Sequence, residues 1–286
     1  MDNFRNRLIH LHHCRGISWK TIYHFLKQDP QLKSLPKSFP YLKEHSPVYS
    51  ECFSDLNSQA IHEQIRQYPS NQIHAITIFD DEYPALLKEI YQPPWVIYAK
   101  GDLSLLQSPR KLAVVGSRES TAYGERAIKY LFPKLIENDY VIVSGLAKGI
   151  DALAHRYAIE NKGRTIGVIA GGFYHLYPRE TAKLAIEMMR TQLVISEYPP
   201  DTRPTRWQFP MRNRIISGLT SGTLVIEAKK KSGSLITANY ALNEGREVFA
   251  LPGSIFSIFS LGTNELIQQG AKMVIRPEDI FEEFSF

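Results

Sequence analysis

The chain has 286 residues, of which 43% are hydrophobic and 22% are charged, a balance typical of a folded globular protein rather than a disordered one. Its formal net charge of +5 favours an anionic partner, either nucleic acid or a membrane surface. The only two cysteines, Cys14 and Cys52, form no Cys-x-x-Cys pair, which argues against a disulfide framework or a cysteine zinc site and favours a reducing cytoplasm. No apolar run is long enough for a signal peptide or a membrane span, so we expect neither secretion nor membrane insertion.

The first 70 residues predict a small helical domain. Short amphipathic patterns around residues 4–11 and 19–26 favour helices, and several prolines interrupt the segment. From Ile73 onward the pattern changes to short β-rich runs such as HAITIF and WVIYA. We therefore expect two domains, residues 1–70 and 71–286.

Between Lys111 and Arg276, apolar strands alternate with segments of helix length. The predicted strands are LAVVG, VIVSG, TIGVIA, LVISE, TLVIEA, EVFALPG and KMVIR. They are apolar throughout rather than alternating, as expected when helices cover both faces of a sheet. This rhythm predicts an α/β fold, a doubly wound and mostly parallel sheet.

Glycines and cations follow three successive strands of this predicted sheet. In open α/β sheets ligands gather at the carboxyl ends of the strands, where the next helices present free N–H groups. One such loop is explained by a tight turn alone, but three in register favour a phosphate-binding rim. The candidate residues are Gly116, Ser117 and Arg118, then Ser144, Gly145 and Lys148, and then Gly171, Gly172 and Arg179.

Two common nucleotide motifs are absent from the sequence. The first loop reads GSRESTAYG, which places Arg118 where the dinucleotide fingerprint needs a close-packed glycine, and no G-x-x-x-x-G-K-[ST] occurs. A hydride-transfer enzyme and a P-loop NTPase are therefore disfavoured.

The segment from Thr202 to Ile226 contains four arginines and no acidic residue. Arginine forks bind phosphate oxygens bidentately, and a helix is expected to begin near Pro210. Alternatively, one arginine pairs with Glu197 or Glu227 at a neighbouring strand end. We expect at least one structural and one phosphate-facing arginine, and the sequence leaves open which of Arg212 and Arg214 is structural.

A group of aromatic residues and a run of lysines also lie near the predicted rim. Rings at Phe173, Tyr174, His175 and Tyr177 either stack on unpaired bases or pack their own loop on the sheet. The run Lys229–Lys231 is interpreted as a solvated helix face.

No catalytic or metal-ligand pattern stands out in the sequence. Asp151 and His155 lie one helical turn apart and are interpreted as a helix-capping carboxylate and a packed imidazole rather than as an acid–base pair. We expect no catalytic residue, no metal and no cofactor.

The segment after Pro252 is unusually apolar. It carries more apolar surface than a short crossover needs, so we expect a homodimer interface there. The predicted interface residues are Ile255, Phe256, Leu266 and Ile267.

Taken in order, the motifs resemble those of the DNA-processing protein A family, also called Smf, over nearly the whole chain. The matching segments are VVGSR, SGLAKGID with His155, Tyr177-Pro178, SEYPP, FPMRNRIISGL, EAKKKSGSLITA and GREVFALPG. The resemblance implies an N-terminal domain similar to sterile-alpha-motif modules and an extended Rossmann domain that dimerises. The chain ends at Phe286, soon after the last predicted strand, so we expect no winged-helix domain of the kind that many relatives carry.

The resemblance also implies a function. Members bind single-stranded DNA in a basic pocket through residues that correspond to Arg118 and Arg179, protect incoming strands, and load a RecA-type recombinase onto them during natural transformation, without catalysis. The alternative is a Rossmann enzyme similar to cytokinin-activating phosphoribohydrolases, in which Arg212 or Arg214 would pair with Glu227. The chain lacks the PGGxGTxxE motif of those enzymes.

Overall fold

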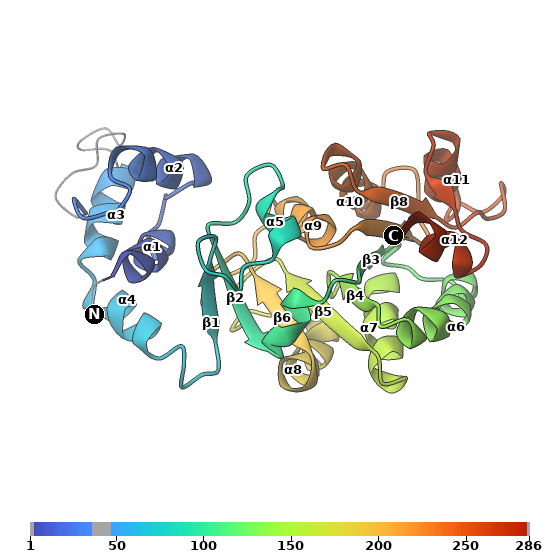
Figure 1. Cartoon of the computed structure of the whole chain (residues 1–286), viewed down its shortest axis with the longest axis horizontal. Coiled ribbons are helices and arrows are strands. Elements are labelled where there is room, and N and C mark those ends of the chain that lie inside the picture. The colour runs from blue at the N-terminus through green and yellow to red at the C-terminus, as the bar shows by residue number, and fades with distance from the viewer. Residues whose placement is uncertain (1–2, 36–46, 285–286) are drawn as a thin grey trace. The chain divides into compact units, whose positions relative to one another are not determined.

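The computed structural model describes residues 3–35 and 47–284, and the chain divides into two compact units (Figure 1). The first unit comprises Met1–Tyr83 and Gln92–Ala99, and the second comprises Pro84–Tyr91 and Lys100–Phe286. The expected domain boundary after residue 70 stays a prediction, because compactness alone does not test it.

The first unit contains four helices and a strand pair among its described residues: α1 (Phe4–His13), α2 (Trp19–Gln28), α3 (Pro47–Leu56), α4 (Gln59–Arg66), β1 (His74–Thr77) and β2 (Val96–Gly101), whose last two residues belong to the second unit. The side chains of Asn3, Ser18 and Ser58 accept hydrogen bonds from first-turn N–H groups and so start α1, α2 and α4. The strands β1 and β2 are antiparallel. The two predicted amphipathic helices are confirmed as α1 and α2.

The second unit alternates strands and helices, as the sequence rhythm predicts. Its elements are α5 (Ala85–Lys88), η1 (Leu103–Gln107), β3 (Lys111–Val115), α6 (Ala122–Glu137), β4 (Val141–Ser144), α7 (Ile150–Glu160), β5 (Arg164–Ile169), η2 (Arg179–Thr181), α8 (Ala182–Thr191), β6 (Leu193–Ser196), α9 (Gln208–Gly218), β7 (Gly222–Val225), α10 (Gly233–Asn243), β8 (Glu247–Ala250), α11 (Leu261–Gln268), β9 (Lys272–Met273), α12 (Glu278–Phe281) and η3 (Glu282–Phe284). Within the described residues, no helix has an apolar stretch long enough to cross a bilayer.

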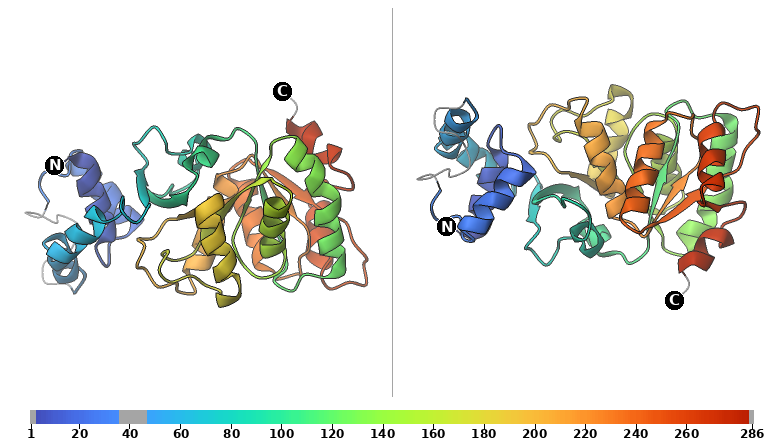
Figure 2. Two further views of the ribbon diagram at one scale, coloured as in Figure 1. Left: turned by 90° about the horizontal axis from the view of Figure 1, so that it is seen from below. Right: turned by 90° about the horizontal axis from the view of Figure 1, so that it is seen from above.

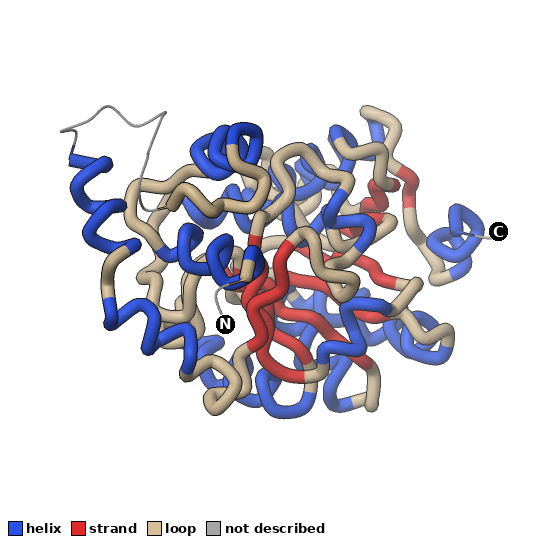
Figure 3. The backbone as a smooth tube through the Cα atoms, turned by 60° about the vertical axis from the view of Figure 1, so that its left-hand side comes forward, coloured by secondary structure: helices blue, strands red, loops and turns tan. Residues whose placement is uncertain are grey.

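The strands of this unit lie in the order β6-β5-β4-β3-β7-β8-β9, and each neighbouring pair is parallel. The green and gold helices α6, α7 and α8 cover one face, and the orange and red helices α9, α10 and α11 cover the other (Figure 2). The tube view shows the red strands between blue helices (Figure 3). The predicted α/β fold with a doubly wound, mostly parallel sheet is thus confirmed.

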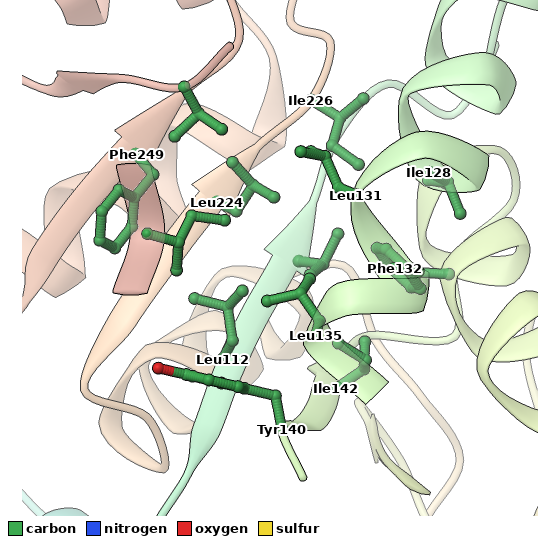
Figure 4. Packing of buried hydrophobic residues seen from close by; sticks show 14 of the residues in the cluster. Leu112, Ile128, Leu131, Phe132, Leu135, Tyr140, Ile142, Leu224, Ile226 and Phe249 are labelled. Carbon is green, nitrogen blue, oxygen red and sulfur yellow. The ribbon is translucent and has the colours of Figure 1, made fainter. Parts of the chain in front are cut away.

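A large apolar cluster fixes this sheet. Leu112 and Leu224 on the neighbouring strands β3 and β7 are fully buried, as are Phe132 and Leu135 on α6 (Figure 4). Burying each such side chain contributes about 1.5–3 kcal/mol. The packing holds the strands firmly, so their carboxyl ends present the following loops in fixed positions.

The chain reverses its direction across the sheet between β3 and β7. From β3 it proceeds through β4, β5 and β6 on one side, whereas from β7 it proceeds through β8 and β9 on the other. The loops that leave β3 and β7 therefore diverge and open a crevice at the carboxyl ends of these strands, the usual ligand position in such sheets.

Candidate nucleic-acid interface

A cavity of about 660 Å³ lies at this crevice. Its wall includes the loop after β3, the start of α9 and the turn that precedes α10. The charged residues that line it are the cations Arg118, Arg206, Arg212, Lys229 and Lys231 and the carboxylates Glu119 and Asp151. The excess of cations makes this cavity suited to an anionic ligand.

The loop that carries Arg118 is fixed by its neighbours. The N–H of Ile150 donates to the carbonyl oxygen of Ser117 at 3.1 Å, and Gly149 adopts a φ of +73°. A β-carbon on Gly149 would collide with that carbonyl oxygen, so only glycine lets the loops after β3 and β4 meet. At the far end of the loop, the buried carboxylate of Glu227 accepts hydrogen bonds from the Thr121 N–H at 3.0 Å and the Thr121 hydroxyl at 2.5 Å.

This frame leaves the side chain of Arg118 exposed at the cavity. Within residues 3–35 and 47–284 it forms no ion pair. A guanidinium that is exposed and outside any ion pair, on a backbone held in a fixed position, is the arrangement expected for a phosphate contact.

Arg212 forms part of the cavity wall but is largely engaged by backbone. Its Nη1 donates to the carbonyl oxygens of Gly145 and, at 2.6 Å, of Val168. A β-carbon on Gly145 would overlap the guanidinium, so the glycine leaves room for Arg212 in this position. Burial lowers the pKa of Arg212 to about 10, against the opposing attraction of Asp151. Arg212 therefore ties the loop after β4 and the end of strand β5, at Val168, to α9.

Arg214 is directed elsewhere. It is buried and donates to the carboxylate of Glu197 at the end of β6, and it does not line the cavity. Burial raises the pKa of Glu197, and the attraction of Arg214 opposes that shift. Of the pairings that the sequence left open, the structure forms the one with Glu197, while Glu227 binds Thr121. The arginine–glutamate pair of the enzyme alternative is therefore not formed with Glu227.

Asp151 and His155 are both buried and form hydrogen bonds with neighbouring segments. Asp151 accepts hydrogen bonds from the N–H groups of Gly145 at 3.2 Å and Ala147 at 3.4 Å, so it fixes the loop that precedes α7. The interpretation of Asp151 as the cap of its own helix is wrong, because Gly149 occupies the cap position. His155 is fully buried and forms a 2.6 Å hydrogen bond with the Thr165 hydroxyl. Burial lowers the pKa of His155 to about 3, so the imidazole is neutral.

Of the other predicted rim residues, the cations are exposed, and the serine and glycines are buried. Arg179 is exposed and forms no ion pair in the described part of the chain, whereas the exposed Lys148 pairs with Glu180. Ser144 is fully buried and donates to the carbonyl oxygen of Val114 at 2.6 Å. Gly171 and Gly172 are also buried, and they pack against the segment 199–204. Gly116, Ser117, Arg118 and Arg212 line the cavity, and the remaining predicted residues do not.

The cavity has three cations that the predicted set omitted. Arg206 belongs to the arginine-rich segment, whose composition was its signal, and it is exposed. Lys229 and Lys231 belong to the lysine run interpreted as a helix face, and this interpretation is wrong because α10 begins only at Gly233. The run lies in the turn before α10, where Lys229 pairs with Glu119 at 2.7 Å and Lys231 is exposed.

The rings of the loop after β5 divide between its interior and its surface. Phe173 is buried, whereas Tyr174 and Tyr177 are exposed. Tyr177 lines the cavity and contacts Phe209 of α9 edge to face, with ring centroids 5.7 Å apart.

The predicted dimer residues differ in exposure. Ile255 and Phe256 are 73% and 89% exposed, and Ile267 is partly buried. Leu266 is only 4% exposed because it packs inside its own unit, so the expectation that it faces a partner is wrong.

Comparison with known protein families gives a match to the model described as DNA recombination-mediator protein A, over residues 74–285. The DNA processing protein DprA of Bacillus subtilis (strain 168) is 48% identical over 259 residues, which cover 86% of this chain and 87% of that protein. DprA of Streptococcus pneumoniae (strain ATCC BAA-255 / R6) is 44% identical over 239 residues, which cover 84% and 82%.

Two solved structures are also similar. The X-ray structure of DNA processing protein A from Streptococcus pneumoniae has a TM-score of 0.83 at 37% identity and covers 100% of this chain and 99% of that one. The structure of DNA processing protein A from Helicobacter pylori, which gives insight into the single-stranded DNA binding mode of that protein, has a TM-score of 0.67 at 30% identity and covers 74% of this chain and 95% of that one.

Proposed function

The chain belongs to the DNA recombination-mediator protein A family, and we propose that it acts as such a mediator by binding single-stranded DNA at the cavity between β3 and β7. The observation that carries the proposal is the exposed, uncommitted guanidinium of Arg118 on a rigid loop at the mouth of a cation-rich cavity. The binding of single-stranded DNA by the Helicobacter pylori relative supports the same ligand here.

A strand at this position would contact cations from several strand ends. Arg118, Arg206 and Lys231 offer phosphate contacts from the cavity, and Arg179 offers another from the loop after β5. Ser144, Gly145, Gly171 and Gly172 support these loops from within, and Arg214 supports them through Glu197. Unpaired, flexible strands enter such a crevice more easily than a stiff duplex, so we expect a preference for single strands with little sequence selectivity.

The wider role follows from the family. We propose that the protein covers incoming strands in the cytoplasm during natural transformation and delivers them to a RecA-type recombinase. It has no catalytic step in this proposal, and the engagement of Asp151 by backbone and of His155 by Thr165 supports that view. Incubation with nucleoside monophosphates should release no free base, whereas release would favour the phosphoribohydrolase alternative.

We also propose a homodimer that uses the exposed segment around Ile255 and Phe256, with Ile267 at its border. A two-fold contact would place two DNA-binding cavities on one particle. Such a particle would bridge strands and gain apparent affinity through avidity.

The test is a titration of labelled single- and double-stranded oligonucleotides at several salt concentrations. Arg118→Ala and Arg179→Ala should each weaken single-strand binding and reduce the slope of log affinity against log salt by roughly 0.7. The matched control is Arg190→Ala, which removes an exposed arginine at the carboxyl end of α8, where the helix has run back from the rim. Unchanged affinity and slope in both rim variants would overturn the proposed site.

A further inference from the structure

The first turn of the eleven-residue helix α10 lies in the wall of the cavity. Ser232 caps this helix, and Ser232, Gly233 and Ser234 all line the cavity. The N–H of Gly233 has no acceptor in the described part of the chain. The first N–H groups of a helix have no partner within it, and the helix dipole favours negative charge at this end. The cavity therefore contains an open donor at the positive end of a helix.

Gly233 is a glycine that the fold does not require. It is not among the glycines with a positive φ, and a β-carbon at this position would meet no atom within 4 Å. Alanine is the better helix former, so the local structure alone favours alanine here. A glycine at the start of a helix lets a ligand approach the backbone closely. The open space beside Gly233, in the wall of the cavity, is suited to such a ligand.

Thr237 lies one helical turn after Gly233 and also lines the cavity. The residue is only 1% exposed, yet its hydroxyl forms no hydrogen bond with any described residue. The buried threonines Thr220 and Thr263 instead donate their hydroxyls to carbonyl oxygens of the preceding turn, at 3.0 and 3.1 Å. The Thr237 oxygen is not among the fully enclosed polar atoms that lack a partner, so it reaches solvent through the cavity. A buried hydroxyl without a partner is costly unless a ligand or water completes it.

Lys231 adds a cation to this end of the helix. It is exposed, lines the cavity and forms no ion pair among the residues that the structure describes, whereas its neighbour Lys229 pairs with Glu119. The N–H of Gly233, the hydroxyl of Thr237 and the ammonium of Lys231 are thus three donors without a partner. Donors gathered with positive charge at a helix start match the oxygens of a phosphate group.

We propose that Gly233, Thr237 and Lys231 form a second phosphate subsite in the cavity, which holds a phosphodiester of the bound single strand at the start of α10. This inference deepens the proposed function and rests on it. Arg118 would bind one phosphate and this subsite another. A strand held at both places would span the crevice from the loop after β3 to the helix after β7.

The experiment measures oligothymidylate binding and urea unfolding for four variants. Gly233→Ala should weaken binding on the order of tenfold, the loss expected for one hydrogen bond to a charged group, while the urea midpoint rises because alanine favours the helix. Thr237→Val should weaken binding to a similar extent without lowering the midpoint, because the hydroxyl has no partner to lose, and Thr237→Ser should retain wild-type affinity. Lys231→Ala should reduce the slope of log affinity against log salt by roughly 0.7.

Gln59→Ala is the matched control, since Gln59 is likewise the first residue after a serine cap, in α4, and lines no part of the cavity. Its affinity should equal that of the wild type. Wild-type affinity in both Gly233→Ala and Thr237→Val, with Arg118→Ala still weakened, would overturn the subsite and leave the proposed function intact. Loss of binding with a matching fall of the urea midpoint in both variants would also overturn the subsite, because it would show a structural role. Failure of the wild-type protein to bind the oligothymidylate would overturn both proposals.

Discussion

Arg214 of α9 and Glu197 at the end of β6 form an ion pair in which the two side chains are only 5% and 13% exposed. Neither group lines the cavity, and the pair joins α9 to a strand end. The arginine-rich segment therefore contributes to the fold through Arg212 and Arg214, and to the proposed interface through Arg206.

Arg214→Ala should destabilise the protein by about 3–5 kcal/mol, because it leaves the buried charge of Glu197 without its partner. Urea unfolding followed by circular dichroism measures this change. The exposed pair between Lys148 and Glu180 provides the control, and Lys148→Ala should leave the unfolding transition almost unchanged. An Arg214→Ala protein that is fully stable but binds DNA poorly would instead identify Arg214 as a DNA contact.

Gly149→Ala should weaken DNA binding without removing any charge. The substitution adds strain of about 1–3 kcal/mol at a φ of +73° and pushes the Ser117 carbonyl away, so that the loop carrying Arg118 must move. Salt titrations should therefore show a reduced slope, as for Arg118→Ala. Gly245→Ala isolates the backbone strain, because Gly245 has a φ of +66° with no atom near the added β-carbon, and its binding should match the wild type.

His155 should make stability depend on pH. Its folded-state pKa of about 3 lies below the ordinary value of 6.5, so the unfolded chain binds the proton more readily and stability falls as the pH drops below about 6.5 toward 3. Between pH 7 and pH 5 this residue should cost about 2 kcal/mol. Urea unfolding at both pH values should show that His155→Gln loses about 2 kcal/mol less than the wild type. An identical loss in both proteins would contradict the buried neutral imidazole.

Phe256→Glu should convert the proposed dimer into monomers. Phe256 is 89% exposed within one chain, so the substitution leaves the fold intact but puts an unpaired charge into the proposed contact. Sedimentation velocity gives the oligomeric state, and the monomer should still bind a short oligonucleotide while no longer bridging long ones. Tyr91→Glu, at another exposed ring, should remain dimeric. A wild-type protein that sediments as a monomer at tens of micromolar would rule out the dimer itself.

The sequence alone determined the parallel sheet and which glycines and cations follow its strands. Strand-length apolar runs and the helices between them are local patterns, and the rule that ligands gather at strand ends converts such patterns into positions. Arg118 and Arg179 follow strands β3 and β5, and both are exposed in the loops after them, while their role in binding stays a prediction.

Only the tertiary structure decided which side chains face the cavity. Arg212 and Arg214 are two residues apart on one helix, so they point in nearly opposite directions, and the neighbours that each one meets depend on how α9 packs. One arginine reaches the carbonyl oxygens of Gly145 and Val168, and the other reaches Glu197.

The burial of Leu266 and the turn that holds Lys229 and Lys231 were likewise beyond the sequence. Apolar content does not say which face of α11 meets its own sheet, and a run of lysines is compatible with a helix or a turn. These choices depend on contacts between segments far apart in the chain, whereas composition and periodicity report only on neighbours along it.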